Sequence, residues 1–152
     1  MIIRGAAAAD QGTIRTTVRG ARLYPFDLHW QHFLVAELDG EIVGVGQIRR
    51  HGDGCRELAS LAVLPQYHGH GIGGSLVNAL LEQSARPLYL MCEGELTTYY
   101  VRFGFREIDP ANAPGPLRRK AQFGNRLLRL FARFRRQAAG QRVAVMQLSA
   151  PG

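Results

Sequence analysis

The sequence has few cysteines and lacks any long apolar run. Cys55 and Cys92 are the two cysteines among 152 residues, and their spacing fits neither a disulfide framework nor a zinc site. No apolar run approaches the ~18 residues that a membrane-spanning helix needs, and the N-terminus lacks the layout of a secretion signal. We therefore expect reduced cysteines, no metal, no transmembrane segment and a cytoplasmic location.

Acidic residues are missing from one stretch near the end of the chain. The net charge is +7, but residues 117–139 hold 8 basic residues and no acid, which leaves 11 basic and 12 acidic residues elsewhere. Hydrophobic residues make up 46% and charged residues 20%, as in an ordinary globular protein. At this length, residues 1–152 are expected to form a single domain with a basic helical insertion at about 115–139, before the last strand.

Hydrophobic periodicity predicts antiparallel strands in the first part of the chain. The turn dipeptide Asp39-Gly40 separates two alternating runs, and a second turn at 51–54 leads into a third. The predicted strands lie at 2–4, 33–38, 41–49 and 56–63, and the spacing over 6–20 is compatible with a helix.

The later part of the chain alternates strands with helices. A helix is predicted from about Gly71 to a stop near Pro87, because apolar residues recur there at helical spacing. Strands are predicted at 88–92, 105–108 and 143–148, with a short helix at 96–102. Antiparallel strands followed by this alternation, around a central sheet, indicate a mixed α/β fold.

A glycine-rich turn connects the third antiparallel run to that helix. Its sequence is Gln66-Tyr-His-Gly-His-Gly-Ile-Gly-Gly74. The first turn of a helix presents unpaired backbone N–H groups at the positive end of the helix dipole, which favours an anion. Glycines remove side chains that would keep a diphosphate from the backbone, and they accept unusual dihedral angles. The turn therefore predicts a pyrophosphate site rather than a flexible connector.

The same glycines also match a dinucleotide-binding pattern. Gly69, Gly71 and Gly74 fit G-x-G-x-x-G, and Glu93 follows at about the required distance. A dinucleotide turn should directly follow the first strand of a parallel unit, whereas here hairpin strands come first and residues 65–68 intervene. A nicotinamide enzyme is therefore the weaker alternative.

Two segments resemble the GNAT superfamily of N-acetyltransferases. Leu61-Ala-Val-Leu-Pro-Gln-Tyr-His-Gly-His-Gly-Ile-Gly is similar to its cofactor motif Q/R-x-x-G-x-G/A, and Tyr99-Tyr-Val-Arg-Phe-Gly-Phe105 is similar to its F-Y-x-x-x-G-F segment. The likeness covers roughly residues 2–108 and the last strand. It implies the GNAT acyl-CoA N-acyltransferase fold, with acetyl-CoA as co-substrate, and direct transfer of the acetyl group to a primary amine without a covalent enzyme intermediate.

The resemblance also implies a cofactor site. In this family, backbone groups of the strand before the turn pair with the pantetheine arm, and a main-chain N–H polarises the thioester carbonyl. The residues expected to bind the cofactor are Leu61, Ala62, Val63, Gln66, Gly69, His70, Gly71, Ile72, Gly73 and Gly74.

The resemblance assigns two catalytic side chains. Tyr100 matches the tyrosine that donates a proton to the departing thiolate, and a purely structural alternative is a core aromatic residue. Glu57 occupies a position where some members hold the base that takes a proton from the incoming ammonium. By strand alternation it should share a face with Leu61, although a solvated or ion-paired glutamate is an equal alternative. His51, His68 and His70 are rival bases.

One departure from the family pattern lies at Glu93, where many members place an asparagine. An acidic residue is a poor neighbour for phosphate. Glu93 and Glu95 could attract a cationic amine, but two surface carboxylates are the simpler interpretation.

The basic segment predicts an amphipathic helix. Phe123, Leu127, Leu130, Phe131 and Phe134 recur at helical spacing, while arginines lie on another side. The favoured interpretation is that the apolar face covers the sheet or a partner subunit in a homodimer. Binding of nucleic acid, of an anionic membrane surface or of an acidic protein is the alternative.

The sequence leaves the acceptor open. In this family variable loops shape the acceptor site, and here these are residues 20–32 and 109–140. A small amine, a peptide terminus, a lysine or an antibiotic all remain candidates. The competing function is a non-enzymatic module on the same fold that binds CoA, nucleic acid or an acidic partner.

Overall fold

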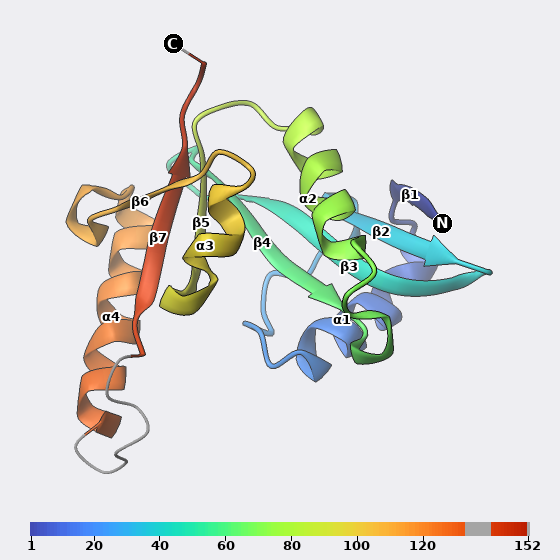
Figure 1. Ribbon diagram of the computed structural model, residues 1–152, viewed down its shortest axis with the longest axis horizontal. Helices are drawn as coiled ribbons and strands as arrows, with labels where there is room; N and C mark the ends of the chain where they lie inside the picture. The colour runs from blue at the N-terminus through green and yellow to red at the C-terminus, as the bar shows by residue number, and fades with distance from the viewer. Residues whose placement is uncertain (133–140, 152) are drawn as a thin grey trace. The chain divides into compact units, whose positions relative to one another are not determined.

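A computed structural model describes residues 1–132 and 141–151 of the chain. Among these described residues there are seven strands and four α-helices, in two compact units, one formed by residues 1–49 and 58–85 and the other by the described part of 50–57 and 86–152 (Figure 1). The predicted mixed α/β class is confirmed. Among the described residues, no helix is both long and apolar enough to cross a membrane.

The first unit is built on four strands in the order β1-β2-β3-β4. The hairpin between β2 and β3 forms because Asp39 and Gly40 both have positive φ, 49° and 79°, as a tight two-residue hairpin turn requires. β1 pairs antiparallel with β2, and β2 pairs antiparallel with β3. The strands are β1 (Ile2–Gly5), β2 (Phe33–Leu38), β3 (Glu41–Arg50) and β4 (Arg56–Val63), of which Arg50, Arg56 and Glu57 belong to the second unit.

Two helices cover opposite faces of these strands. Ile14 and Val18 of α1 (Gln11–Gly20) pack with Val45 in a fully buried cluster. On the other face lies α2 (Ile72–Gln83), close to the backbone of Gly44 and Gly46, where a Cβ atom would come within 3.0 Å of leucine side chains of that helix (Figure 1). These two glycines let α2 approach the sheet closely. Short 3₁₀ helices lie at Ala8–Asp10, Trp30–His32 and Pro65–Tyr67.

The second unit has three strands in the order β5-β7-β6. Both neighbouring pairs are antiparallel, with Leu88 opposite Leu148 and Arg106 opposite Gln147. Its elements are β5 (Leu88–Glu93), α3 (Thr97–Val101), β6 (Arg106–Ile108), α4 (Gly115–Ala132) and β7 (Val143–Leu148), with 3₁₀ helices at Gly94–Leu96 and Pro110–Asn112.

The basic helix α4 packs on β7 through a different face from the predicted one. Leu117 and Ala121 are fully buried beside Val145, and the Asn125 side chain bonds the backbone N–H and carbonyl of Val143 at 2.8 and 3.2 Å. The expected apolar stripe instead faces solvent: the side chains of Phe123, Leu127 and Leu130 are 63%, 37% and 50% exposed.

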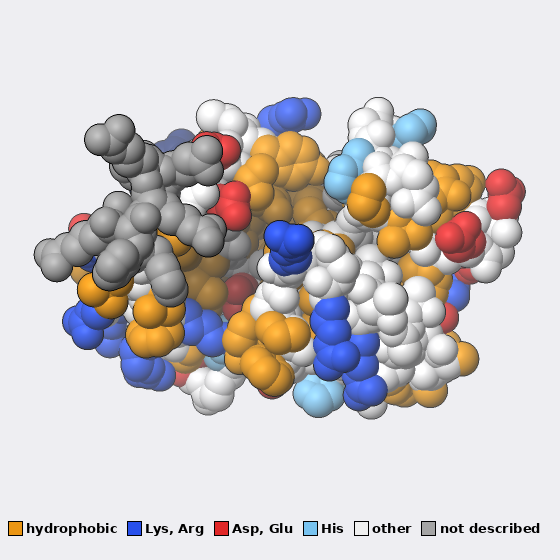
Figure 2. Space-filling model, turned by 90° about the horizontal axis from the view of Figure 1, so that it is seen from below, with side chains coloured by type: hydrophobic (Ala, Val, Ile, Leu, Met, Phe, Trp, Pro, Cys, Tyr) orange, Lys and Arg blue, Asp and Glu red, His pale blue; other side chains and the backbone are white. Residues whose placement is uncertain are grey.

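The prediction that this stripe covers the sheet is therefore wrong for Phe123, Leu127 and Leu130, and the prediction that it covers a partner subunit stays a prediction. The packed face is marked instead by Leu117 and Ala121, which recur at i and i+4 on the side that meets β7. Hydrophobic and basic side chains lie next to one another at the left of the surface view, where α4 lies (Figure 2). The side chains of Phe131 and Phe134 fall outside the described residues.

Candidate active site

The glycine turn lies between β4 and α2, as the sequence predicted. Gly69 and Gly71 adopt φ angles of 81° and 77°, in the left-handed region that favours glycine. Gly71 directly precedes α2, and its carbonyl accepts hydrogen bonds from both the backbone N–H and the hydroxyl of Ser75, each at 3.0 Å. A helix therefore begins immediately after an exposed turn in which two residues need the glycine conformation.

Two histidines hold the turn in shape. A carbonyl oxygen only accepts, so His68 donates from Nε2 to the carbonyl of Val63 at 2.7 Å. The Nδ1 atom of His70 lies 3.1 and 3.0 Å from the carbonyl oxygens of Tyr67 and His68. Both side chains are exposed and are used in backbone contacts, which favours a role in turn geometry over their candidacy as bases.

The strand and helix ends bring the predicted cofactor residues together on one strand–turn–helix segment. Ala62 and Ile72 are buried and anchor the segment in the core, whereas Gln66 and Gly69 are exposed. The first N–H groups of α2 have no partner within the helix by helix geometry. This arrangement offers backbone donors at the positive end of a helix dipole to an anion.

β4 is irregular within the predicted strand. Ser60 has a φ of 56°, outside the β region. Its hydroxyl accepts from Nε2 of the fully buried Gln47 at 2.9 Å. Leu61 contacts the face of Gly46, whereas Ala62 packs in the core on the α1 side. The alternation of side chains along β4 is interrupted at Ser60. It therefore does not show that Glu57 lies on the same face of the strand as Leu61.

Gln47 and Arg49 also form hydrogen bonds to the segment before Trp30. This segment belongs to residues 20–32, which the sequence predicted to be an acceptor loop. Nε2 of Gln47 donates to the carbonyl of Asp27 at 3.2 Å, and Arg49 donates to that of Phe26 at 3.4 Å. The Arg49 guanidinium lies 5.3 Å from the ring centroid of Tyr24. Sequence patterns gave no sign of this buried polar network, because both residues sit on an otherwise apolar strand.

Glu57 is almost fully buried in the second unit, with an exposed fraction of 4%. Its Oε1 atom lies 2.8 Å from Nε2 of His51, and the His51 side chain is itself only 10% exposed. The solvated alternative for Glu57 is therefore excluded, whereas the ion-paired alternative and the base assignment both remain predictions. The two residues flank the tight loop between β3 and β4.

Tyr100 lies on α3 with an exposed fraction of 9%. Its ring makes edge contacts with Tyr99 and Phe105, at centroid distances of 5.1 and 6.2 Å. Burial raises the pKa of Tyr100 well above the usual value for a phenol, with smaller contributions from Cys92 and Tyr99. The hydroxyl therefore stays protonated at neutral pH, as a proton donor must, and it is also a core aromatic residue.

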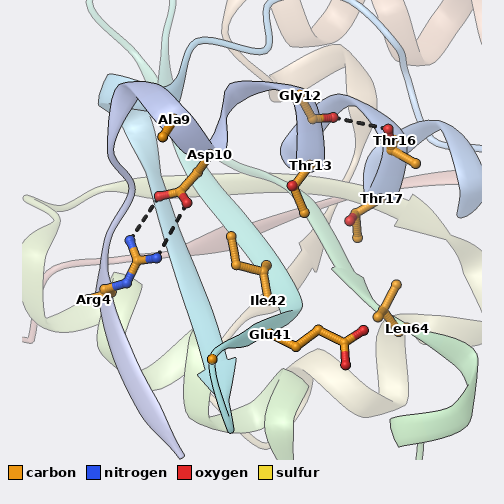
Figure 3. A pocket seen from close by; sticks show the side chains of 11 residues that line it. Arg4, Ala9, Asp10, Gly12, Thr13, Thr16, Thr17, Glu41, Ile42 and Leu64 are labelled. Atoms are coloured by element: carbon orange, nitrogen blue, oxygen red, sulfur yellow. Dashed lines mark hydrogen bonds and ion pairs between the residues drawn. The ribbon is translucent and has the colours of Figure 1, made fainter.

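A cavity of about 770 Å³ opens in the first unit away from these residues (Figure 3). It lies between α1, with three threonines, and the beginning of β3, and an ion pair between Arg4 and Asp10 at 2.8 Å borders it. Among the residues that line it, Leu64 directly follows the predicted cofactor strand. None of the predicted site residues lines the cavity.

Glu93, which stands where the family pattern has an asparagine, and Glu95 are both exposed. This agrees with the simpler interpretation of two surface carboxylates.

Comparisons with known proteins show which proteins this chain is similar to. A family model described as "Acetyltransferase (GNAT) domain" matches residues 29–107, slightly more than half of the chain, and it spans parts of both units. An amino-acid acetyltransferase from Mycobacterium tuberculosis is 40% identical over 85 residues, which cover 52% of this chain but only 48% of that protein.

Solved structures show the same fold. Rv2747 from Mycobacterium tuberculosis, in complex with CoA and NLQ, superposes with a TM-score of 0.70 at 22% identity, over 99% of this chain and 100% of that chain. N-acetylglutamate synthase from Neisseria gonorrhoeae, in complex with coenzyme A and N-acetyl-glutamate, superposes with a TM-score of 0.70 at 19% identity, over 98% of this chain and 35% of the other.

Proposed function

Because this chain belongs to the GNAT family of acetyl-CoA-dependent acyltransferases, we propose that it transfers the acetyl group of acetyl-CoA directly to the primary amine of a small acceptor. The observation that carries the proposal is the strand–turn–helix segment ending at α2, with left-handed glycines at 69 and 71. Its backbone donors suit the pyrophosphate of the co-substrate.

The strand residues before the turn would hold the rest of the co-substrate. Leu61, Ala62 and Val63 would contribute backbone groups to the pantetheine arm, and one of their N–H groups would polarise the thioester carbonyl. Backbone donors fixed in a strand stabilise the developing oxyanion without having to reorganise. The cofactor assignments rest on the motif and on this local geometry.

Glycine at position 71 allows a test of the pyrophosphate assignment. A Cβ at this position would meet no atom within 4 Å, so the constraint is the φ of 77° rather than space. Replacement by alanine is expected to lower the free energy of unfolding by roughly 1–2 kcal/mol, and Gly71→Asn by less, because asparagine tolerates the left-handed region.

Both variants are expected to bind acetyl-CoA more weakly, because a side chain at the turn obstructs the diphosphate. Isothermal titration with acetyl-CoA measures the affinity, and denaturant unfolding measures stability separately. If Gly71→Asn bound acetyl-CoA as tightly as the unsubstituted protein, the diphosphate would not lie on this turn.

Two side chains would move the protons of the reaction. Glu57 would take a proton from the acceptor ammonium, and the free amine would attack the thioester carbon to form a C–N bond. Collapse of the tetrahedral intermediate would break the C–S bond and release a second proton from nitrogen. Tyr100 would protonate the departing thiolate and be reprotonated from solvent, so that the products are amide, CoA thiol and one proton.

Neither cysteine is suited to a covalent route. Burial, with a smaller contribution from Asp53, raises the pKa of Cys55 to about 12, and burial raises the pKa of Cys92 to about 11. Both thiols are therefore protonated at neutral pH and are poor nucleophiles. This supports direct transfer in a ternary complex.

For the acceptor, we propose the α-amine of a free amino acid. The support is the relative from Mycobacterium tuberculosis, which is described as an amino-acid acetyltransferase and shares 40% identity over 85 residues with this chain. The loop held by Gln47 and Arg49 would shape the acceptor site.

The test is release of CoA thiol from acetyl-CoA in the presence of single amino acids, with mass spectrometry of the acetylated product. Peptides with free N-termini, lysine-containing peptides blocked at the N-terminus and aminoglycosides serve as competing acceptors. Turnover with free amino acids supports the proposal, and turnover only with another class replaces the acceptor assignment. Tight CoA binding without turnover on any amine would favour the non-enzymatic alternative.

A further inference from the structure

The loop between β3 and β4 brings the side chain of His51 into contact with that of Glu57, the predicted base. His51 N–H donates to the carbonyl of Cys55 at 2.9 Å, and Gly54 N–H donates back to the carbonyl of His51 at 2.9 Å. The backbone of Cys55 also bonds a carboxylate oxygen of Asp53 at 3.0 Å. Since His51 lies opposite Cys55, Glu57 is its diagonal neighbour two residues further along, within reach of a long side chain.

The direction of the contact follows from the chemistry of the two groups. A base must be ionised before it takes a proton, and an ionised carboxylate only accepts hydrogen bonds. In the form of Glu57 that can act as a base, Nε2 of His51, 2.8 Å from Oε1, therefore carries the hydrogen and donates it. The two side chains are only 10% and 5% exposed. Loss of this donor from a buried carboxylate costs free energy, so the contact also has a structural value.

We propose that His51 is a positioning residue that holds the Glu57 carboxylate in the orientation needed to take a proton from the acceptor ammonium. This inference rests on the proposed function. A base that a third group orients by a hydrogen bond is a recurrent catalytic arrangement. One carboxylate oxygen accepts from His51, and a carboxylate offers about four lone-pair sites in all, so this hydrogen bond does not occupy the whole group.

The contacts of this loop fix the position of the His51 backbone. Its backbone is closed on Cys55 by a hydrogen bond, and Cys55 packs against the buried cluster that includes Leu117 and Val145. The histidine ring therefore extends from a loop anchored in the core of the second unit. Asp53 is a second carboxylate near His51, but it is exposed and bonds the backbone of Cys55.

The experiment compares His51→Phe, which removes the donor, with His51→Gln, which retains an N–H at a similar reach. In the thiol-release assay with the best acceptor, His51→Phe is expected to lower kcat by about 10- to 100-fold, the range seen when outer hydrogen-bond partners of metal ligands are removed. The KM for acetyl-CoA should not change. His51→Gln should recover most of the lost rate.

A double-mutant cycle separates positioning from a purely structural effect. In a Glu57→Gln background, His51→Phe should cause no further loss of kcat, because the group that it positions is no longer a base. Melting temperatures of all four proteins show whether the variants remain folded at the assay temperature.

Four results would overturn the inference. It fails alone if Glu57→Gln loses activity while His51→Phe does not, or if His51→Phe lowers kcat equally in both backgrounds. If Glu57→Gln retains the full kcat, the base assignment fails and the role of His51 fails with it. The absence of turnover with every amine would overturn both the proposed function and the inference.

Discussion

Replacing Glu57 by glutamine is expected to lower kcat by about 10²- to 10⁴-fold, the usual contribution of a general base. Glutamine has the same shape and can accept from His51 through its amide oxygen, so packing around this buried position should change little. It cannot take a proton from an ammonium. Steady-state kinetics with the identified acceptor, together with acetyl-CoA affinity by titration, separate catalysis from cofactor binding.

The matched control for this variant is Glu82→Gln, because Glu82 is an exposed carboxylate on α2. It should leave both kcat and acetyl-CoA affinity unchanged. A smaller loss in the Glu57 variant at high pH would be expected as well, because the free amine is then present without a base. A kcat for Glu57→Gln within twofold of the unsubstituted enzyme would remove Glu57 from the mechanism.

Replacing Tyr100 by phenylalanine is expected to lower kcat by about 10²- to 10⁴-fold if the phenol is the acid that protonates the thiolate. Phenylalanine keeps the ring contacts with Tyr99 and Phe105, so the melting temperature should change little. The loss should shrink with an acyl donor whose leaving thiol is more acidic, because such a thiolate needs less help from an acid. Single-turnover rates with the two donors provide the comparison.

The neighbouring Tyr99 supplies the control and resolves which tyrosine acts. Tyr99 is more exposed than Tyr100, stacks edge-on with Phe103 and has the Arg102 guanidinium 5.1 Å from its ring centroid. Tyr99→Phe should keep near-normal kcat. If Tyr99→Phe lost activity and Tyr100→Phe did not, the general acid would be Tyr99 and Tyr100 would be a core residue.

The sequence predicted the elements of this fold well because their signals are local. The turn dipeptide Asp39-Gly40 forces a tight hairpin, and the glycines at 69 and 71 occupy the left-handed region that their spacing before a helix suggested. The strands agree with prediction to within one residue, and α2 begins one residue after Gly71 but ends at Gln83, before the stop predicted near Pro87. The antiparallel strands before the turn also weaken the nicotinamide alternative, and the GNAT family match replaces it.

Features that depend on tertiary contacts were not predictable in the same way. The positive φ of Ser60 breaks the alternation used to orient Glu57, and no local pattern indicates it. For α4, the regularly spaced apolar residues from Phe123 onward suggested the packed face, but Leu117 and Ala121 pack against β7, and Phe123 remains exposed. The pair formed by His51 and Glu57 arises from a cross-strand diagonal, which requires knowing how the loop pairs.

The most direct test of the central claim is the melting temperature of the purified protein with acetyl-CoA, with NAD as the comparison ligand. A ligand that binds only the native state stabilises it by mass action, by about 2.7 kcal/mol at a concentration 100 times the Kd. We predict a rise that grows with acetyl-CoA concentration and no rise with NAD. No rise at saturating acetyl-CoA, or a rise with NAD instead, would contradict the assignment of the glycine turn and the function built on it.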